Sequence, residues 1–285
     1  MNKEFLYQNK KIFYRITGSG KPVILIHGFG EDGTVWRNQV GQPPQTPPKD
    51  GLTIAQPPLI QNSLLTEKFK FIIPDLPGSG QSEMIDDMSM EGMAEVIHFI
   101  IHEEEIESCP VIGHSMGGYI TLAFAQKYWN HLDALGLFHS TAYADSEEKK
   151  VIRKKGIEFI HQYGVFEFLK TTTPNLFSHQ TRDEKPELID EQVTSLSNFS
   201  SAALVKYYEA MMQRPDRTDI LRKTTIPVLF ILGENDNAIP LKDGLEQCRL
   251  PEKSYIHILR QSGHMGMLEE AIYSSRIMEQ FLISI

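Results

Sequence analysis

The first place where residue types and spacing indicate chemistry is the pentapeptide 113–117, which reads Gly-His-Ser-Met-Gly and follows the apolar run 109–112. A glycine-x-serine-x-glycine pattern after a strand is typical of a sharp strand-to-helix turn that exposes the serine hydroxyl. A side chain at Gly113 or Gly117 is expected to crowd the neighbouring strand or helix. Taken alone, the pattern also fits a plain glycine-rich turn. The apolar residues that recur at helical spacing after it favour a strand, turn and helix in sequence, and catalysis further requires partners elsewhere in the chain.

Candidate partners for Ser115 follow two late strands. A serine hydroxyl is a weak nucleophile until a neutral imidazole removes its proton, and a carboxylate must fix the tautomer of that imidazole. Asp236 lies just after the predicted strand 227–232, and His264 lies just after the predicted strand 254–259. Because functional sites of parallel sheets lie at the carboxyl ends of the strands, we expect these side chains at one edge of the sheet.

The elements that must position these residues alternate along the chain. Continuous apolar strands separated by amphipathic helices predict an α/β fold, with a mostly parallel sheet and helices on both faces. Strands are predicted at 4–8, 11–16, 23–26, 69–73, 109–112, 132–138, 227–232 and 254–259. Helices are predicted at 89–106, 118–128, 147–163, 187–196, 202–213 and from about 267 to 282.

Two stretches interrupt the alternation. Between residues 145 and 221 the strand pattern stops and charged, amphipathic helical segments replace it, which indicates a helical insertion. Residues 41 to 61 contain six prolines and no apolar periodicity, so an extended or flexible loop is predicted there. That loop is interpreted as a surface insertion; the alternative is a flap or docking arm near the site entrance.

Five motifs at strand ends, taken in order, resemble those of the α/β-hydrolase superfamily over essentially the whole chain. They are His27-Gly28-Phe29-Gly30, Asp75-Leu76-Pro77-Gly78-Ser79-Gly80, the pentapeptide 113–117, Gly233-x-x-Asp236 and Gly263-His264. The resemblance implies an α/β-hydrolase fold. Its core would comprise 1–144 and 222–285, with 145–221 as an inserted helical cap and 41–61 as a loop insertion within the core.

The resemblance also implies a role for each site residue. Ser115 would be the nucleophile, His264 the base and Asp236 the acid that orients it. The oxyanion hole would be formed by two backbone amides, those of Met116 and Phe29. No cofactor and no metal are implied.

Other polar residues near these motifs are interpreted as structural. Glu234 and Asp243 lie near Asp236, but Asp236 has the loop position of the family's acid, and Glu234 is expected to be solvated. His98 and His102 are spaced i, i+4, but no carboxylate falls between them as in the pattern His-Glu-x-x-His, so no metal site is predicted.

The remaining candidates are expected to support the site. His27 is expected to shape its loop, and His114 to pack beneath the turn at Ser115. Asp75 belongs to a motif that normally supports the site in the resembling family, and His257 falls inside a predicted strand, where a structural role is expected.

The predicted cap contains enough apolar side chains to form an acyl or aromatic pocket as well as its own core. The sequence does not separate residues that bind substrate from residues that hold the helices together. Candidates for substrate binding are Phe159, Phe166, Phe177, Tyr208 and Met211.

Composition limits the partners. The net charge is −9, from 28 basic and 37 acidic side chains, which disfavours nucleic acid or an anionic membrane surface as the main partner. No apolar run approaches the roughly 20 residues that span a bilayer, and the N-terminus lacks the apolar core of a signal peptide. Cys109 and Cys248 lie in or beside predicted regular elements, so a reduced, cytoplasmic setting is expected.

The sequence therefore predicts a cofactor-independent serine hydrolase that cleaves a small or medium carboxylic ester through an acyl-enzyme. Relatives that hydrolyse carbon-carbon bonds or transfer the acyl group use the same three residues, so these activities stay open. A third alternative is a receptor-like homologue that binds a small molecule with little turnover. Oligomeric state and substrate identity are not predicted.

Overall fold

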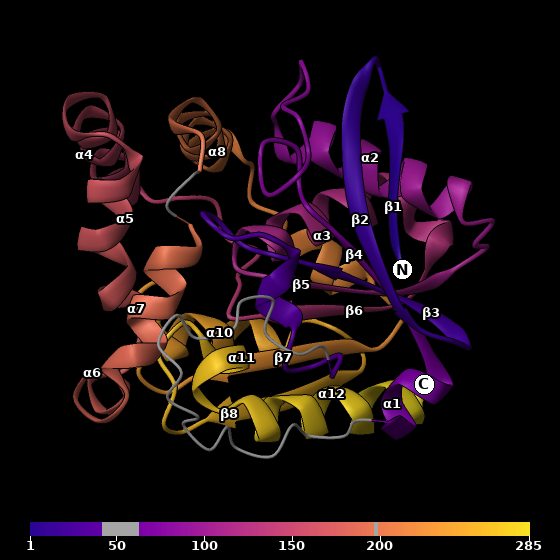
Figure 1. The fold of residues 1–285 in the computed structure, drawn as a ribbon. Coiled ribbons are helices and arrows are strands. Elements are labelled where there is room, and N and C mark those ends of the chain that lie inside the picture. The colour runs from indigo at the N-terminus through magenta and orange to yellow at the C-terminus, as the bar shows by residue number, and fades with distance from the viewer. Residues whose placement is uncertain (42–62, 197–198) are drawn as a thin grey trace, which may run out of the picture.

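A computed structural model describes residues 1–41, 63–196 and 199–285, so the predicted loop 41–61 lies outside the described residues except for Gly41. One eight-stranded sheet runs through the molecule in the order β1-β2-β4-β3-β5-β6-β7-β8 (Figure 1). The strands are β1 (Asn2–Tyr7), β2 (Lys10–Gly18), β3 (Lys21–Ile26), β4 (Phe69–Pro74), β5 (Cys109–His114), β6 (Leu132–Phe138), β7 (Val228–Gly233) and β8 (Ser254–Leu259).

The sheet is mostly parallel, as predicted. β1 and β2 form an antiparallel hairpin through Gln8 and Asn9, both with left-handed backbone (φ 50° and 62°). β2 also pairs antiparallel with β4, and every later pairing is parallel. The carboxyl ends of β3, β5, β6, β7 and β8 consequently meet at one edge, where the candidate residues are expected.

Helices cover both faces of this sheet. They are η1 (Gly33–Trp36), α1 (Ser63–Lys68), α2 (Met90–Glu103), α3 (Met116–Tyr128), η2 (Trp129–His131), α9 (Thr218–Lys223), α10 (Leu241–Cys248), α11 (Gly266–Glu269) and α12 (Ala271–Ser284). α1, α9 and α10 were not predicted from the sequence. They are short helices of six to eight residues, for which the periodic signal is weak.

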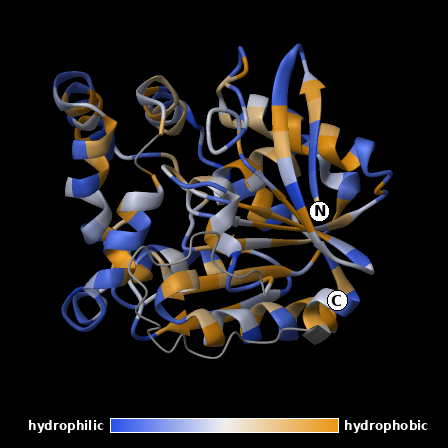
Figure 2. Cartoon of the chain, viewed as in Figure 1, coloured by the Kyte–Doolittle hydropathy of each residue, from blue (hydrophilic) through white to orange (hydrophobic). Residues whose placement is uncertain are grey.

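Alternate residues of the strands enter two separate apolar cores. Ile24 and Ile26 of β3 belong to the core beneath α2 and α3, whereas Val23 and Leu25 belong to the core beneath η1, α11 and α12. Side chains of a strand point to opposite faces in turn, so a strand buried on both sides reads as a continuous apolar run. Figure 2 shows this as hydrophobic colouring along the central strands.

A helical segment between β6 and β7 lies beside the sheet (Figure 1). It contains α4 (Glu147–Tyr163), α5 (Val165–Thr172), η3 (Thr173–Leu176), α6 (His179–Glu184), α7 (Pro186–Ser195) and α8 (Ser201–Gln213). We call residues 147–213 the helical segment. The helices predicted at 147–163, 187–196 and 202–213 correspond to α4, α7 and α8.

Two predicted helices differ from the structure. The single helix predicted from about 267 to 282 is wrong, because Glu270 has non-helical backbone (φ −122°, ψ 51°) and separates α11 from α12. Its carboxylate accepts hydrogen bonds from Gln261 N and Ser262 Oγ. The helix predicted at 89–106 ends at Glu103, because Glu105 has left-handed backbone (φ 53°). Among the described residues, no helix combines the length and apolar character needed to cross a bilayer.

Candidate active site

Ser115 occupies the tight turn between β5 and α3. Its backbone is strained for a non-glycine residue, with φ 50° and ψ −114°. Two hydrogen bonds hold that conformation: Ser115 N donates to Phe138 O at 2.9 Å, and Ser140 Oγ donates to Ser115 O at 2.7 Å. Both partners lie in or just after β6, so the neighbouring strand fixes the serine.

The two glycines of the pentapeptide are required by space, as expected from the sequence. A Cβ on Gly113 would lie 2.2 Å from the backbone of Gly117, and a Cβ on Gly117 would lie 2.4 Å from Ile26 O. Neither glycine has a positive φ. The close approach of α3 to β3 and β5, rather than an unusual dihedral angle, therefore excludes other residues here.

The structure brings Ser115, His264 and Asp236 together from three strand ends. Ser115 Oγ lies 2.8 Å from His264 Nε2, and His264 Nδ1 lies 2.8 Å from Asp236 Oδ2. The other carboxylate oxygen, Asp236 Oδ1, accepts the backbone N–H groups of Ala238 and Ile239 at 2.8 and 2.9 Å. Since a carboxylate only accepts, Nδ1 of His264 carries a proton and Nε2 is free to accept the serine proton.

The electrostatics keep Asp236 ionised. Burial alone would raise the pKa of Asp236, but the neighbouring His264 and hydrogen bonds from two histidines hold it well below its usual range. Asp236 is 7% exposed and His264 is 4% exposed, so water competes little for these contacts. The arrangement pairs a neutral imidazole with a buried carboxylate, as general-base catalysis on a hydroxyl requires.

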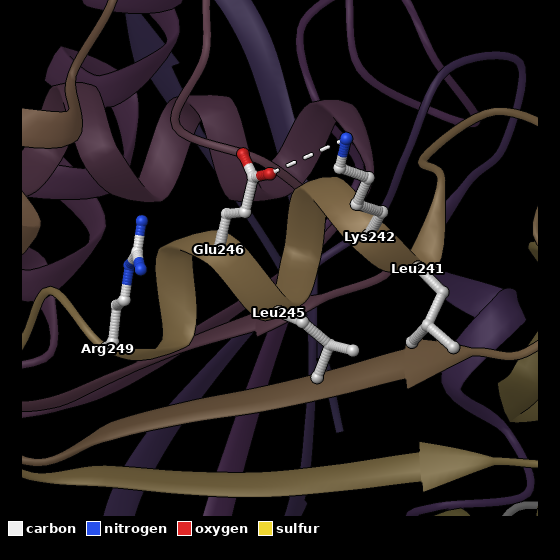
Figure 3. A pocket seen from close by; sticks show the side chains of 5 residues that line it. All are labelled: Leu241, Lys242, Leu245, Glu246 and Arg249. Carbon is white, nitrogen blue, oxygen red and sulfur yellow. Dashed lines mark ion pairs between the residues drawn. The ribbon is translucent and has the colours of Figure 1, made fainter.

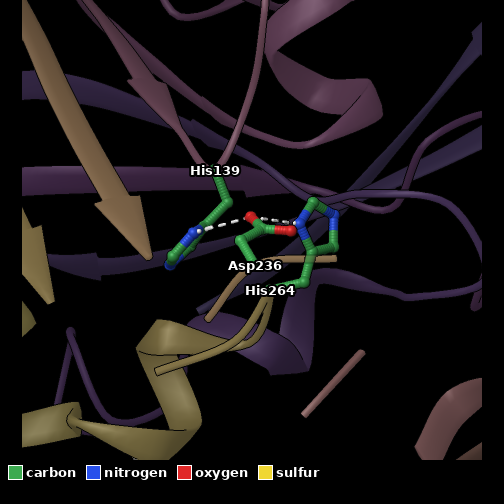
Figure 4. Close-up of side chains that lie close together, drawn as sticks. All are labelled: His139, Asp236 and His264. Atoms are coloured by element: carbon green, nitrogen blue, oxygen red, sulfur yellow. Dashed lines mark hydrogen bonds and ion pairs between the residues drawn. The ribbon is translucent and has the colours of Figure 1, made fainter. Parts of the chain in front are cut away.

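His139, directly after β6, was not singled out from the sequence. Its Nδ1 lies 3.1 Å from Asp236 Oδ2, the oxygen that also bonds His264 (Figure 4). Burial lowers the pKa of His139 to about 4. The rule that directed attention to residues after strand ends would have included His139, but nothing else in the sequence distinguishes it.

Glu31 is a second functional candidate that sequence reasoning missed. Its Oε2 accepts Gly28 N at 2.7 Å and lies 3.0 Å from His114 Nδ1, while His114 Nε2 lies 2.9 Å from the backbone oxygen of His264. Both neighbours of the His114 ring are acceptors, so both ring nitrogens donate and the ring is an imidazolium. One carboxylate thus links the loop after β3, the turn at Ser115 and the loop that carries His264.

The pKa shifts of this pair agree with that assignment. Burial would lower the pKa of His114, but the adjacent Glu31 carboxylate raises it overall. Burial would raise the pKa of Glu31, but His114 and the Gly28 amide lower it overall. Both side chains are almost fully buried, so each charge depends on the other.

Two further predicted supports lie in the loops after β3 and β4. His27 Nε2 accepts Leu76 N at 2.9 Å, and its Nδ1 lies 2.8 Å from Gly28 O, so His27 shapes its loop as expected. The Asp75 carboxylate pairs with Arg15 and accepts Gly33 N at 2.9 Å. These contacts join the loops after β3 and β4.

Other sequence candidates lie away from this site. Glu234 is exposed, and His257 lies within β8. His98 stacks on Tyr128, with ring centroids 3.9 Å apart. Among the described residues, one group has the spacing of metal ligands, namely His139, Asp236 and His264. Because the two Nδ1 atoms already face Asp236 Oδ2, a metal would have to displace their protons.

The two predicted oxyanion donors have different surroundings. Met116 begins α3 immediately after Ser115. Phe29 lies in the loop after β3, and its ring stacks on Tyr208 with centroids 4.3 Å apart and an interplanar angle of 13°. Their backbone amides stay predictions as oxyanion donors.

The five substrate-binding candidates occupy different environments in the helical segment. Tyr208 contacts Phe29, as described, and also packs edge-to-face on Phe168. Phe159 is partly buried against the same core, and Met211 is almost fully buried in it. Phe177 is fully buried in the core on the other side of the sheet, whereas Phe166 is 41% exposed.

Polar contacts anchor the helical segment at two places. At its base, Asp145 accepts Arg153 Nε at 2.5 Å and pairs with Arg214 Nη1 at 2.8 Å, which joins the beginning of the segment to its end. Further along, Glu269 Oε2 accepts Ser178 N and Thr181 Oγ1, both at 2.8 Å.

Glu269 also holds the loop that carries His264. Its Oε1 accepts the backbone N–H groups of Gly263 and Met265, which flank His264. In addition, His264 N donates to Leu176 O at 2.6 Å. The loop that carries His264 is therefore held by η3 and the start of α6.

A surface hollow lies on the outer side of α10 and contains none of these groups. Figure 3 shows its lining, in which Lys242 and Glu246 form an ion pair of 4.0 Å. The lining residues are Leu241, Lys242, Leu245, Glu246 and Arg249. All belong to one helix or its end, so the hollow is separate from the site at Ser115.

Comparison with known proteins agrees with this fold. Residues 59–266 match the sequence model of the Ndr family. The chain is 24% identical over 295 residues to a 2-hydroxy-6-oxononadienedioate/2-hydroxy-6-oxononatrienedioate hydrolase of Escherichia coli (strain K12), covering 99% of this chain and 94% of that protein.

Solved structures with the same fold include esterases and a lactonase. A thermophilic esterase from Thermogutta terrifontis superposes with a TM-score of 0.85 at 26% identity, over 100% of this chain and 98% of that one. The enol-lactonase from Burkholderia xenovorans LB400 gives a TM-score of 0.83 at 18% identity, over 99% and 100% of the two chains. The second likeness concerns the fold alone.

Proposed function

We propose, since the chain belongs to the Ndr family within the α/β-hydrolase superfamily, that it hydrolyses small or medium carboxylic esters through an acyl-enzyme. The observation that carries the proposal is the continuous contact from Ser115 Oγ to His264 Nε2 and from His264 Nδ1 to Asp236, at 2.8 Å each. The similarity to an esterase at 26% identity supports it.

The proposed reaction has two stages. Ser115 Oγ attacks the ester carbonyl carbon while His264 Nε2 takes the hydroxyl proton, and Asp236 stabilises the imidazolium that forms. The tetrahedral oxyanion is bound by the amides of Met116 and Phe29. Its collapse breaks the bond to the alcohol oxygen, which receives the proton from His264. Water, deprotonated by the same imidazole, then attacks the acyl carbon. The bond from that carbon to Ser115 Oγ breaks, Oγ takes the proton back from His264, and the acid is released.

We further propose that residues 1–144 and 222–285 form the catalytic core and that residues 145–221 form a cap that selects the substrate. The stacking of Tyr208 on Phe29 supports this division, because Phe29 is also a proposed oxyanion donor. The acyl-binding wall would then include Tyr208, which stacks on Phe29, together with Phe159, Phe166 or Met211. Phe177 is fully buried in the core on the other side of the sheet and is left out of this wall. Cys109 and Cys248 are buried free thiols, which supports a reduced, cytoplasmic setting.

The decisive experiment replaces the nucleophile. Ser115→Ala is expected to lower kcat for short p-nitrophenyl esters by roughly 10³- to 10⁶-fold and to abolish labelling by a fluorophosphonate. Ser284→Ala, at the end of α12, is the matched control and should keep both. Undiminished turnover by the Ser115 variant would exclude the proposed nucleophile.

Carbon-carbon bond hydrolysis is a second candidate, favoured by the similarity to the Escherichia coli enzyme. That enzyme's name denotes a substrate with two carboxylates, which calls for cationic side chains in the binding site. Arg153 and Arg214 are the arginines at the base of the helical segment, and both pair with Asp145. A panel of esters, thioesters and dienedioates of this class would separate the two activities.

A binding protein with little turnover is the third possibility. It predicts tight association with a small molecule and no acyl-enzyme in a mass spectrum of the rapidly quenched protein. The strained backbone of Ser115 argues against it, because that conformation has a cost that a simple binding site does not require.

A further inference from the structure

His139 adopts an unusual backbone conformation that aims its ring at the acid of the site. Its φ is 47°, in the left-handed region that non-glycine residues seldom adopt. The hydrogen bond from His139 N to Ile231 O, at 2.8 Å, ties this residue to β7. A conformation with a cost of this kind persists only where the surrounding structure determines it.

Two glycines leave the space that the ring occupies. A Cβ on Gly233 would lie 2.7 Å from His139 Cε1, and a Cβ on Gly266 would lie 2.4 Å from His139 Nε2. Real Cβ atoms do not approach this closely, so any other residue at either position would displace the imidazole. The end of β7 and the start of α11 thus leave the space that the His139 ring fills.

The hydrogen-bonding pattern fixes the protonation state of this ring. Nδ1 faces the carboxylate of Asp236, whereas Nε2 is buried and has no partner among the described residues. A proton on Nε2 would be a buried donor without an acceptor, and a charged ring would add an unpaired buried charge. His139 is therefore neutral, with its single proton on Nδ1.

The consequence concerns Asp236 Oδ2, which accepts two imidazole N–H groups. The bond from His139 stabilises the negative charge and reduces the strength with which the same oxygen attracts a proton-bearing His264. Together with the bonds from Ala238 N and Ile239 N to Oδ1, the bond from His139 to Oδ2 fixes the orientation of the carboxylate.

We propose that His139 is a positioning residue that holds Asp236 Oδ2 in place and, through it, sets the pH range in which His264 is the free base. This rests on the proposed function, in which His264 removes the proton of Ser115.

Other charged groups also face His264. His114 lies beside it, with ring centroids 5.0 Å apart, and carries its positive charge paired with Glu31. Glu269 holds the amides on both sides of His264. Variants of His139 leave these groups in place, so a change in the pH profile reports the shared carboxylate.

Two substitutions separate the donor from the volume of the ring. In His139→Asn the side-chain amide nitrogen falls near the position of Nδ1, and asparagine tolerates left-handed backbone. In His139→Gln the amide nitrogen falls near the position of Nε2 and cannot reach Asp236 from the same rotamer. His139→Ala removes both donor and volume.

The experiment measures kcat and KM on a short p-nitrophenyl ester across the acid limb of the pH profile, with active sites counted by fluorophosphonate labelling. We expect His139→Gln and His139→Ala to lower kcat per active site about tenfold to a hundredfold. KM should stay within about twofold, and the acid limb should move up by about half to one pH unit. His139→Asn should restore both. His257→Asn, within β8, is the control and should leave the profile unchanged.

The outcomes distinguish positioning from a merely structural role. A structural role would reduce the number of labelled sites or the Tm and leave the acid limb in place. An unmoved limb in His139→Gln, or a folded His139→Asn that behaves like His139→Gln, would overturn the inference even if His139→Ala does not fold. If Ser115→Ala keeps full turnover, the proposed function fails instead, and the two failures are therefore separable.

Discussion

The carboxyl edge of the sheet and the helical segment beside it are built by different means. At the edge, three buried carboxylates, those of Glu31, Asp75 and Asp236, each accept several hydrogen bonds from backbone or imidazole donors. In the segment, contacts among α4, α5 and α8 are largely aromatic, as with Phe159 and Tyr208 on Phe168. The structure of the sheet edge depends on individual hydrogen bonds, whereas the structure of the helical segment depends on the size and shape of its side chains.

This difference separates the two parts of the proposed activity. Polar networks in a buried environment tolerate no missing partner, because an unpaired group keeps its full desolvation cost. Apolar packing tolerates exchange among side chains of similar volume. The reaction therefore depends on a few residues that cannot be exchanged, whereas substrate selection can be altered by substitutions at many positions of the helical segment.

The largest expected effect tests the polar base of the helical segment. Asp145→Ala leaves Arg153 and Arg214 without their carboxylate in a largely buried place, so we expect a loss of about 3 to 5 kcal/mol in the free energy of unfolding. Urea denaturation followed by circular dichroism measures it. Asp183→Ala removes an exposed carboxylate of α6 and should change stability by less than about 0.5 kcal/mol. Equal effects of the two changes would contradict a structural role for Asp145.

An intermediate effect is expected at the edge. Glu31→Gln removes the charge opposite the His114 imidazolium, which should lower stability by about 1 to 3 kcal/mol at pH 6 and reduce kcat. The raised pKa of His114 stabilises the fold fully below its unfolded value, about 6.5, and this contribution is lost as pH rises through the folded value. The lowered pKa of Glu31 contributes above its unfolded value, about 4.5, and is lost as pH falls through the folded value.

The pair is therefore expected to stabilise the protein most between about pH 4.5 and 6.5. The difference in Tm between wild type and Glu31→Gln should be largest in that window and should shrink toward pH 9. Glu234→Gln, at an exposed position, is the control and should follow the wild type. A Tm difference that grows with pH would show that His114 is not protonated in the folded protein.

The smallest effect on stability is expected for Tyr208, where the helical segment contacts the loop after β3. Tyr208→Leu removes the stacking on Phe29 and should cost about 0.5 to 1.5 kcal/mol. Turnover of acetate esters should stay within about threefold, while the preference among longer acyl chains changes. Tyr273→Leu, at an exposed position of α12 outside the helical segment, is the control and should leave that preference unchanged. A uniform loss of activity on all chain lengths would place Tyr208 in the chemistry rather than in selection.

The sequence was informative where a local rule fixes a residue. The pattern at 113–117 is contiguous and its two glycines have a steric reason. Asp236 and His264 each follow a recognisable strand. The mostly parallel α/β fold and the three residues that meet at Ser115 could therefore be predicted from the sequence. His139 and Glu31 were not, because their roles depend on contacts with residues 97 and 83 positions away. Nothing local marks such a partner.

The helical segment illustrates the other limit. Its amphipathic periodicity predicted α4, α7 and α8, but the periodicity says only that one face is buried. Phe177 and Phe166 were equivalent candidates in the sequence, and they differ completely in exposure. The break at Glu270 was missed because periodicity does not show tertiary contacts. The Glu270 carboxylate accepts hydrogen bonds from the loop before His264, and the backbone of Glu270 is not helical.

Glu269 has a consequence for exchanging selectivity between relatives. One of its oxygens accepts hydrogen bonds from the loop that carries His264, and the other accepts from Ser178 and Thr181 of the helical segment. A chimera that replaces residues 145–221 would keep Glu269 and lose both of its partners in the segment. In choosing a donor segment, a serine or threonine pair at positions 178 and 181 should therefore count for more than similar aromatic residues around Tyr208.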